Sequence, residues 1–445
     1  MTNKYIVLCI LTLTLSTSSA FAQNGINSPY SRYGFGIMSD RAMGFNKAMA
    51  GVAQGFRDGQ QINTANPASY SAIDSLTALF DIGVSLYNGN YEMGNLKQNA
   101  KNSSFDYFAF QFRVRKNMGV TLGILPYTNI NYSFSSTSET LTGNENVTSS
   151  YSFTGNGGLH KVFLGAGWRI MKPISIGVNG SFIFGDYTHT STMSFSQTSA
   201  YSMVRGYNAN ISTWGVDFGL QFIQPISKKD RFTLGITYGL GHDIKNRALR
   251  YSETLNSTSV VQGITNDTIK NAFQLPHTFD VGISYVHGMK WRVGADFSLE
   301  KWSKCKFPAE ENGTYIVGKN QLNDRTKIAL GGEYTPNYVG KSYFSRMSYR
   351  LGAYYSRSYA KADNTGIVTD KPTEFGVTAG FVLPIQNRNL WHNSPKINVS
   401  LQWVHTDIPY LNSITLNQST LKENYLKLCL GLTFSERWFF KWKVQ

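Results

Sequence analysis

The sequence is poor in cysteine, charge and long apolar runs, and each shortage excludes a class of protein. It has 3 cysteines in 445 residues, which is too few for a disulfide-rich secreted scaffold. Charged residues make up 16% of the chain, whereas soluble domains average about a quarter. No mature stretch approaches the roughly 20 apolar residues that a membrane helix needs. The chain is therefore predicted to be neither an ordinary soluble protein nor a helical membrane protein.

The first residues have the layout of a secretory signal. Lys4 precedes an apolar run from Tyr5 to Leu15, and Ala20-Phe21-Ala22 follows before Gln23. A charged start, a short apolar middle and an A-x-A end are typical of a cleaved signal peptide, so we expect residues 1–22 to be removed. Cys9 lies too near the start to accept a lipid anchor.

Two cysteines, Cys305 and Cys429, remain after this processing. They follow no metal-ligand spacing, and their separation along the chain allows either one disulfide or two unpaired thiols. We expect two unpaired thiols, because barrels of the kind inferred below rarely need a disulfide.

What the sequence does have is a repeated two-residue alternation. From Leu76 to Leu86 apolar residues occupy every second position, which is typical of a strand with two unlike faces. Fourteen such segments follow one another, and so many two-faced strands would leave a soluble protein with too much exposed apolar surface. Gly, at 41 residues, and aromatics, at 14%, suit strands between lipid and a polar lumen. The predicted fold is all-β: a transmembrane antiparallel up-and-down barrel of about 14 strands, spanning residues 73–445.

The connections between these segments alternate in length. Short turns occur at residues 115–117 and 171–173, whereas long polar stretches at residues 135–156, 188–210 and 243–274 are expected to be outer loops. This alternation is typical of a bacterial outer-membrane barrel, and an even strand count returns both termini to the periplasm. The last segment, from Leu426 to Phe434, ends in an aromatic and basic tail from Trp438 to Lys443, which suits a barrel-insertion signal.

Residues 23–72 lack alternation, so they either hang in the periplasm or fill the lumen. The runs at 39–44 (Ser-Asp-Arg-Ala-Met-Gly) and 50–53 (Ala-Gly-Val-Ala), Asp58, and the element Asn66, Pro67 and Ala68 resemble the hatch of the FadL family of outer-membrane hydrophobic-compound transporters. The segments Gly157-Gly158-Leu159, 165–169 and 176–178 resemble its central strands. The resemblance implies an N-terminal hatch over residues 23–72 and transport of a hydrophobic or small amphipathic molecule.

The residues between the lipid-facing ones include many charges, so the lumen is expected to be polar and mixed in sign. These charges are expected to pair with one another and with plug residues, because buried charges need partners; the other interpretation is a charged route for a polar solute. The predicted lumen charges are Asp81, Arg113, Asp217, Arg231, Asp280, Arg292, Asp296, Glu300, Glu333 and Arg350.

Pro126 follows Ile124-Leu125 in the third strand and cannot donate a ladder hydrogen bond. In the resembled family a kink in the third strand makes a lateral opening, so Pro126 marks either such an opening or a bend near the outer rim.

Nothing in the sequence predicts catalysis, a metal or a cofactor. The 7 histidines show no H-E-x-x-H or other paired ligand spacing. No G-x-S-x-G elbow occurs, and the glycines at Gly165 and Gly167 lie in a strand.

Three function classes remain after these exclusions. The first is a FadL-like transporter or channel. The alternative is a non-transporting structural subunit of an outer-membrane protein secretion or assembly complex, and a polar porin comes last. The formal net charge of +15 favours anionic lipid and lipopolysaccharide over nucleic acid at such a location. Further expected partners are a hydrophobic ligand or envelope proteins.

Overall fold

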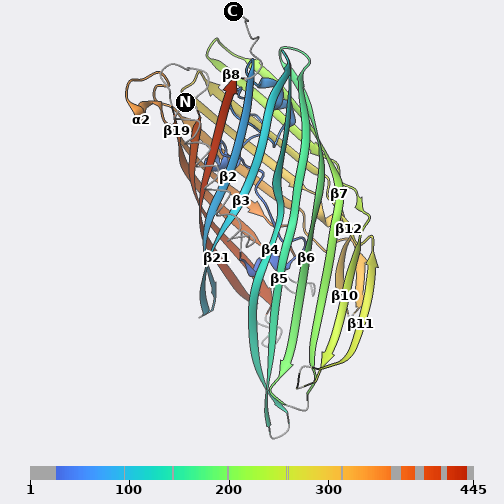
Figure 1. Cartoon of the computed structure of the whole chain (residues 1–445). Coiled ribbons are helices and arrows are strands. Elements are labelled where there is room, and N and C mark those ends of the chain that lie inside the picture. Colours follow the sequence, from blue (N-terminus) through green and yellow to red (C-terminus); the bar gives the residue numbers. More distant parts are fainter. Residues whose placement is uncertain are drawn as a thin grey trace, which may run out of the picture.

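The computed structural model describes residues 27–437, apart from 95, 143–144, 198–199, 257, 259, 312–313, 362–371, 386–394 and 412–417. Its main feature is a closed antiparallel barrel of 14 strands, in which the first strand pairs with the last (Figure 1). In chain order the barrel strands are β2 (Thr77–Met93), β3 (Leu96–Arg115), β4 (Met118–Thr142), β5 (Glu145–Arg169), β6 (Ile174–Phe195), β7 (Ser202–Pro225), β8 (Asp230–Gly239), β13 (Thr278–His287), β14 (Trp291–Glu300), β17 (Arg325–Tyr334), β18 (Ser348–Arg357), β19 (Thr373–Pro384), β20 (Lys396–Leu411) and β21 (Gln418–Arg437). The predicted fold class is confirmed, while the predicted signal peptide and the tail from Trp438 lie outside the described residues.

The strands form because their two faces meet different surroundings. On β6 the outward Val178 and Phe182 are exposed, whereas the intervening Asn179 and Ile183 are buried. The same alternation places a continuous band of apolar side chains on the outside of the barrel, as a lipid-embedded wall requires. Among the described residues, no helix is both long and apolar enough to cross a membrane.

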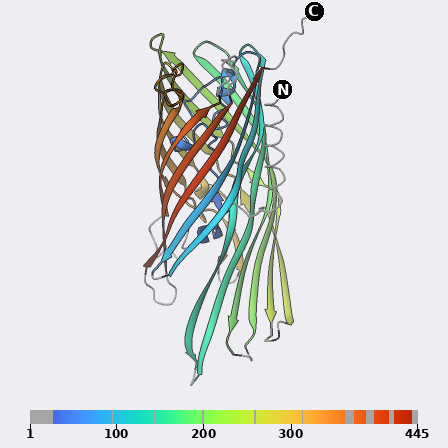
Figure 2. The same ribbon diagram turned by 60° about the vertical axis from the view of Figure 1, so that its left-hand side comes forward.

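One end of the barrel has short turns, and the other has strands that extend far past their neighbours. The connection between β17 and β18 at the short-turn end contains the helix α2 (Tyr343–Arg346). At the long end β4 to β7 project well beyond β2, β3 and β21 (Figure 2). They are joined there by β10 (Arg247–Leu255), which pairs with β7, and by β11 (Val261–Lys270).

The expectation of outer loops at residues 135–156, 188–210 and 243–274 was therefore wrong in part. The β4–β5 ladder continues to Thr142↔Glu145, and the β6–β7 ladder continues to Met193↔Met203. These extensions are rich in Ser, Thr and Asn and lie beyond the apolar band of the wall. Neither of their faces has to be apolar, so they remain strands without an apolar alternation. Residues 243–274 likewise contain β9 (Asp243–Ile244), β10, β11 and β12 (Phe273–Gln274).

The wall also contains a seam between β3 and β4. Their ladder runs from Arg115↔Met118 only to Phe108↔Ile124, after which β3 stays paired with β2 and β4 with β5. The two strands diverge beyond this point (Figure 1). The wall beyond Ile124 is therefore not closed by a barrel strand on that side of β4.

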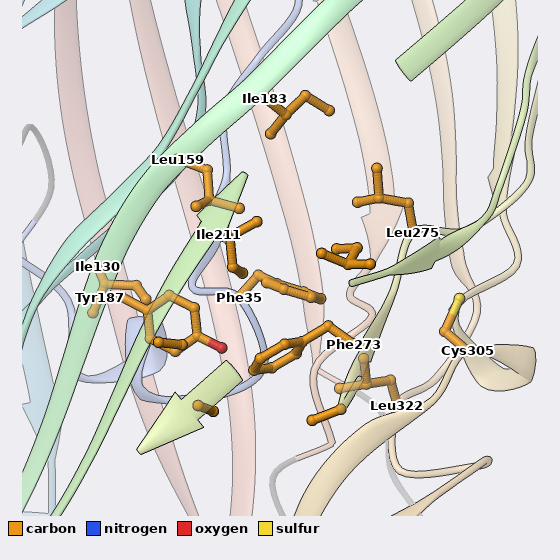
Figure 3. Packing of buried hydrophobic residues seen from close by; sticks show 14 of the residues in the cluster. Phe35, Ile130, Leu159, Ile183, Tyr187, Ile211, Phe273, Leu275, Cys305 and Leu322 are labelled. Atoms are coloured by element: carbon orange, nitrogen blue, oxygen red, sulfur yellow. The ribbon is translucent and has the colours of Figure 1, made fainter. Parts of the chain in front are cut away.

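The N-terminal segment lies inside the barrel (Figures 1 and 2). It contains η2 (Pro29–Arg32), β1 (Ile37–Met38), η3 (Lys47–Met49) and η4 (Pro67–Ala72). Near the long end, residues of η5 (Trp302–Lys304), β15 (Phe307–Glu311) and β12 pack on Phe35; β15 pairs with β16 (Thr314–Gly318). Figure 3 shows Phe35 facing Phe273 and Tyr187 in this buried cluster, with ring centroids 5.3 and 6.3 Å away.

Candidate functional site

The candidate functional site is the contact between the plug and the inner wall, and wall glycines shape it. A Cβ on Gly177 of β6 would lie 2.3 Å from the Pro67 carbonyl carbon, and one on Gly219 of β7 would lie 2.4 Å from Asn66 Oδ1. Only glycine permits so close an approach of the plug to the backbone of a wall strand. The segment from Asn66 to Ala72 is thus set directly into the wall formed by β4 to β7.

We call such a close contact between a wall glycine and the plug a glycine seat, and the first seat is formed by Gly177 and Gly219. Two further seats, on β8 and β17, contact the rest of the plug. On β8 a Cβ at Gly235 would lie 1.8 Å from the Gln54 carbonyl oxygen, and on β17 a Cβ at Gly331 would lie 2.5 Å from that of Met49. The three seats lie on different parts of the barrel circumference, so the plug touches the wall on several sides. Gly165 of β5 also faces the plug, because a Cβ there would lie 2.8 Å from the Tyr70 ring and 1.9 Å from Asn179 Oδ1 of the wall.

The Asn66-Pro67-Ala68 element is an N-cap. Asn66 is fully buried, and its Oδ1 accepts a hydrogen bond from Ala68 N at 3.1 Å, which starts η4 with Pro67 in the first turn. Its Nδ2 donates to the carbonyls of Gln54 and Leu220, at 3.1 and 3.2 Å. One side chain therefore joins η4, the preceding plug segment and β7.

A buried ion pair ties η3 to β3. Lys47 Nζ bonds Asp106 Oδ2, and the two side chains are 5% and 7% exposed. Asp106 also accepts from Ser85 at 2.8 Å and lies 3.4 Å from Lys427 Nζ. It is the extra residue of a β-bulge, because Gly83 pairs with Tyr107 and Val84 with Phe105. The bulge turns the carboxylate inward from a position that simple alternation would point at lipid.

A second charged group joins the plug to β14, β17 and β18. Arg292 pairs with Asp58 of the plug and lies 3.5 Å from Glu333, which in turn accepts from Arg350 at 2.6 Å. Arg350 also donates to the Gly44 carbonyl at 3.3 Å. Burial by itself would raise the pKa of the Asp58 carboxyl, but Arg292 and then Lys396 outweigh it and hold that pKa well below its usual range.

A third charged group lies toward the long end. Arg41 contacts Asp280 at 3.3 Å and Glu300 at 3.9 Å, and Arg325 contacts Glu300 at 2.8 Å. Nearby, Asp296 Oδ2 accepts from the backbone of Ala53 and Gln54, at 2.6 and 3.0 Å. Carboxylates of the wall thus bind both a cation and backbone amides of the plug.

The remaining predicted lumen charges have local partners. Asp81 is buried and accepts from Tyr107 OH at 3.0 Å, and Asp217 pairs with Lys161 at 2.6 Å. Arg231 donates to the Arg57 carbonyl at 3.2 Å. Arg113 differs, because it lies at the short-turn rim and donates to Ser75, outside the packed plug.

The seam between β3 and β4 is covered by the N-terminal strap, residues 27–39. Ile37 and Met38 pair with Asn129 and Thr128 of β4. Ser28 N donates to the Asn131 carbonyl at 2.9 Å, while its hydroxyl donates to Glu423 of β21 at 2.6 Å. The strap therefore bonds to wall strands on both sides of the seam.

Pro126 lies at this seam. The β4–β5 register shifts between Pro126 and Thr128, so the proline coincides with a bulge. On the inner side of this bulge, Ser39 N donates to the Tyr127 carbonyl at 3.0 Å. The local cavity has a volume of about 40 Å³ and is lined by Asp217, Asp280 and other charged groups. The inner side of this bend is therefore polar and covered.

The cavities between the wall and residues 38–65 of the plug are small. Two more of them, besides the one at Pro126, have volumes of about 10 and 70 Å³. A cavity of about 150 Å³ is what holds benzene in a protein core. These spaces suit a few water molecules and not a hydrophobic ligand.

Sequence reasoning did not predict several of these contacts. The seats were missed because a glycine in a strand says nothing about what approaches it. Lys47 and Asp106 were missed because the bulge breaks the alternation, although a carboxylate in a lipid-facing position is itself a signal for a bulge. Cys305 and Cys429 are both free and buried, and burial raises the pKa of the Cys305 thiol to about 12, with Asp324 and Asp243 adding to the shift.

Within the described part of the chain, no three His, Cys, Asp or Glu residues are grouped so as to hold a metal ion. His242, for example, makes structural contacts: it stacks on Trp214 at 4.0 Å and bonds Thr213 at 2.8 Å.

Comparisons with known proteins agree with the fold. The model of a family named BamG matches residues 1–445. A FadL homologue of Pseudomonas aeruginosa superimposes with a TM-score of 0.60 at 11% identity, covering 91% of this chain and 100% of that one. The toluene transporter TodX of P. putida superimposes with a TM-score of 0.58 at 11% identity, covering 91% of this chain and 100% of that one. The toluene transporter TbuX of Ralstonia pickettii superimposes with a TM-score of 0.56 at 13% identity, covering 90% of this chain and 99% of that one. These neighbours are transporters and not enzymes, and the predicted FadL-like fold is confirmed. No curated protein matches the sequence.

Proposed function

Since this chain belongs to the BamG family, we propose that it is a plugged barrel acting as a structural subunit of an outer-membrane protein-assembly complex. The observation that carries the proposal is the fixed plug, held by glycine seats on β6, β7, β8 and β17 and by buried ion pairs such as Lys47–Asp106. Moving the plug would separate these charges inside the barrel, which is strongly unfavourable.

We also infer the chain's layout in the envelope. Residues 1–22 act as the export signal, residues 23–72 form the hatch, and residues 73–445 form the barrel. Both termini lie in the periplasm, and the extended ends of β4 to β7 project from the cell surface. The lipid-facing band contacts outer-membrane lipid and lipopolysaccharide.

The experiment that tests this proposal is purification from native membranes in a gentle detergent, followed by mass spectrometry of proteins and lipids. We expect other envelope proteins in fixed stoichiometry and no enriched hydrophobic ligand. A solitary barrel carrying an enriched hydrophobic compound would contradict the proposal.

Transport of a hydrophobic compound is the second candidate, and the seam between β3 and β4 is the observation that favours it. If the strap at residues 27–39 moved away, an opening toward lipid would appear beside Ile124. Two of the structural neighbours named above, TodX and TbuX, are toluene transporters. Uptake of a radiolabelled monoaromatic compound into proteoliposomes, compared with protein-free vesicles, separates the two candidates.

A further inference from the structure

The turns at the short-turn end of the barrel carry a series of exposed lysines. The turn segments 116–117, 170–173, 226–229, 288–290 and 335–347 each contain at least one, and they contain no Asp or Glu. Because these turns join successive pairs of neighbouring strands from β3 to β18, their lysines are distributed around the end of the barrel. We call this set the basic rim: Lys116, Lys172, Lys228, Lys229, Lys290 and Lys341.

All of these turns but the first also expose a large apolar side chain. Met171, Ile226, Met289 and Phe344 are each more than half exposed. Ile226 continues the outward row of β7 that runs through Phe222, so the apolar band of the wall reaches the turn itself. Exposure of such side chains to water is unfavourable, whereas contact with acyl chains is favourable. Lysine and apolar side chain thus alternate at the edge of the lipid-facing band.

Aromatic side chains on the outer face mark the level at which the hydrocarbon ends. Trp168 and Trp291 are exposed close to the turns, and the Trp291 ring packs on Tyr334 with centroids 4.2 Å apart. Lys290 Nζ lies over the same Tyr334 ring, 5.9 Å from its centroid. Trp and Tyr concentrate at the headgroup level of membrane proteins. The basic rim lies directly beyond this level, where headgroup phosphates are within reach of a lysine side chain.

The acidic groups near the rim are few. Asp230, at the start of β8, is bound by His287 at 2.6 Å and by Tyr285 at 2.7 Å. Asp74 and Glu436 lie beside the first and last barrel strands and are outnumbered by the rim lysines. Within the part of the chain that the structure describes, no ion pair holds a rim lysine to a carboxylate. This end therefore presents a net positive surface at headgroup depth.

We propose that the basic rim binds anionic phospholipids of the periplasmic leaflet, with each lysine beside a headgroup phosphate and the apolar turn residues among the acyl chains. The spread of the lysines from β3 to β18 favours lipid over an acidic protein, which would cover one side of the rim. The proposal rests on the envelope layout inferred above, in which this end faces the periplasm. It deepens the lipid contact inferred there by naming the surface and the lipid class.

Electron spin resonance of spin-labelled lipids tests the proposal on the full-length mature barrel in phosphatidylcholine vesicles. The fraction of label immobilised by the protein is compared for phosphatidylglycerol and phosphatidylcholine. We expect about a three-fold preference for phosphatidylglycerol, because a lysine near a headgroup favours an anionic lipid by about five-fold and only one leaflet contacts the rim. Sodium chloride at about 1 M should remove most of the preference, because the Debye length falls to about 3 Å.

A pair of charge-removing variants locates the binding surface. The rim variant should lose the preference, whereas a control variant that removes five exposed lysines from the long end should keep it. Heat-modifiable migration on gels shows that each variant is a closed barrel. The rim variant carries Lys172→Gln, Lys228→Gln, Lys229→Gln, Lys290→Gln and Lys341→Gln. The control carries Lys97→Gln, Lys245→Gln, Lys270→Gln, Lys319→Gln and Lys422→Gln.

A photo-crosslinking amino acid in place of Met289 identifies the occupant in native outer membranes. We expect a glycerophospholipid adduct; a lipopolysaccharide adduct or a protein adduct in its place would overturn the proposal. Equal immobilisation of the two spin-labelled lipids, or a preference that the rim variant keeps, would also overturn it. Because the vesicles contain no other envelope protein, such a failure leaves the co-purification test of the structural role intact.

Discussion

Replacing Asp106 with Asn should loosen the plug far more than replacing its partner Lys47 with Met. Asp106→Asn leaves two lysines without a carboxylate, Lys47 with a side chain 5% exposed and Lys427 with one 17% exposed. Lys47→Met leaves Asp106 with Lys427 at 3.4 Å and Ser85 at 2.8 Å. The carboxylate on the wall therefore matters more than the cation on the plug.

The expected magnitudes differ by several kcal/mol. Leaving a buried charge without its partner costs about 3–5 kcal/mol, and each 1.36 kcal/mol is a factor of about ten. Asp106→Asn should thus raise the population of undocked plug by about 150- to 5000-fold. Lys47→Met keeps Asp106 paired and loses chiefly a cation–π contact with Tyr107 at 5.6 Å, so about 1 kcal/mol or about five-fold is expected.

Hydrogen exchange followed by mass spectrometry, on peptides that cover residues 43–58, measures this population directly. Planar-bilayer conductance provides a second readout, because an undocked plug should admit ions. Exchange in Asp106→Asn that matches the native protein, or exchange in Lys47→Met that is equally fast, would refute the reasoning. Barrel peptides from β13 and β14 serve as internal controls and should keep their native protection.

The other predictions concern a seat, a pH range and a thiol. Gly177→Val should accelerate hydrogen exchange of the η4 amides by at least ten-fold, because its Cβ would meet the Pro67 backbone. Gly180→Ala on the same strand should not, because the nearest atom to its Cβ would be 3.8 Å away. Equal effects of the two substitutions would contradict the seat at Gly177. The pKa of Asp58 is lowered in the docked state, so its ionised carboxylate stabilises docking at pH values above the pKa of the unfolded chain, about 3.9. That stabilisation is lost as the pH falls toward the folded pKa, so conductance should stay flat from pH 8 to 5 and rise only below about pH 4. Asp58→Asn should show no step attributable to this group. Cys305, whose pKa is raised to about 12 by burial, should resist maleimide at pH 8 until the barrel is unfolded, and rapid labelling of the folded barrel would show that the thiol is accessible.

The barrel could be predicted from sequence because lipid imposes a strict rule on one face of each strand. Outward residues such as Phe182 must be apolar, so the alternation is visible along the chain. Beyond the lipid-facing band this rule no longer applies, and there the strands could not be predicted from the sequence. The ends of β4 to β7 are polar on both faces, and the same Ser-rich and Thr-rich sequence suits a loop or a strand.

The site was predicted only in its charges. Asp280, Arg292 and Glu333 could be placed inside by alternation. The structure shows that Asp280 contacts Arg41 of the plug and Arg292 contacts Asp58 of the plug, whereas Glu333 contacts Arg292 and Arg350 of the wall. The seats and the bulge at Asp106 depend on how two distant segments approach each other. No local pattern encodes that distance, so the glycines that permit it resemble any other glycines in a strand.

The seats also have a mechanical consequence. An empty barrel can flatten into an ellipse with little change in its hydrogen bonds, but here Gly177, Gly235 and Gly331, on different sides of the wall, bear on one continuous plug. Flattening would press backbone against backbone at one seat and break contacts at another. The outer surface therefore keeps one curvature under lateral load, as a rigid support for a neighbouring protein must.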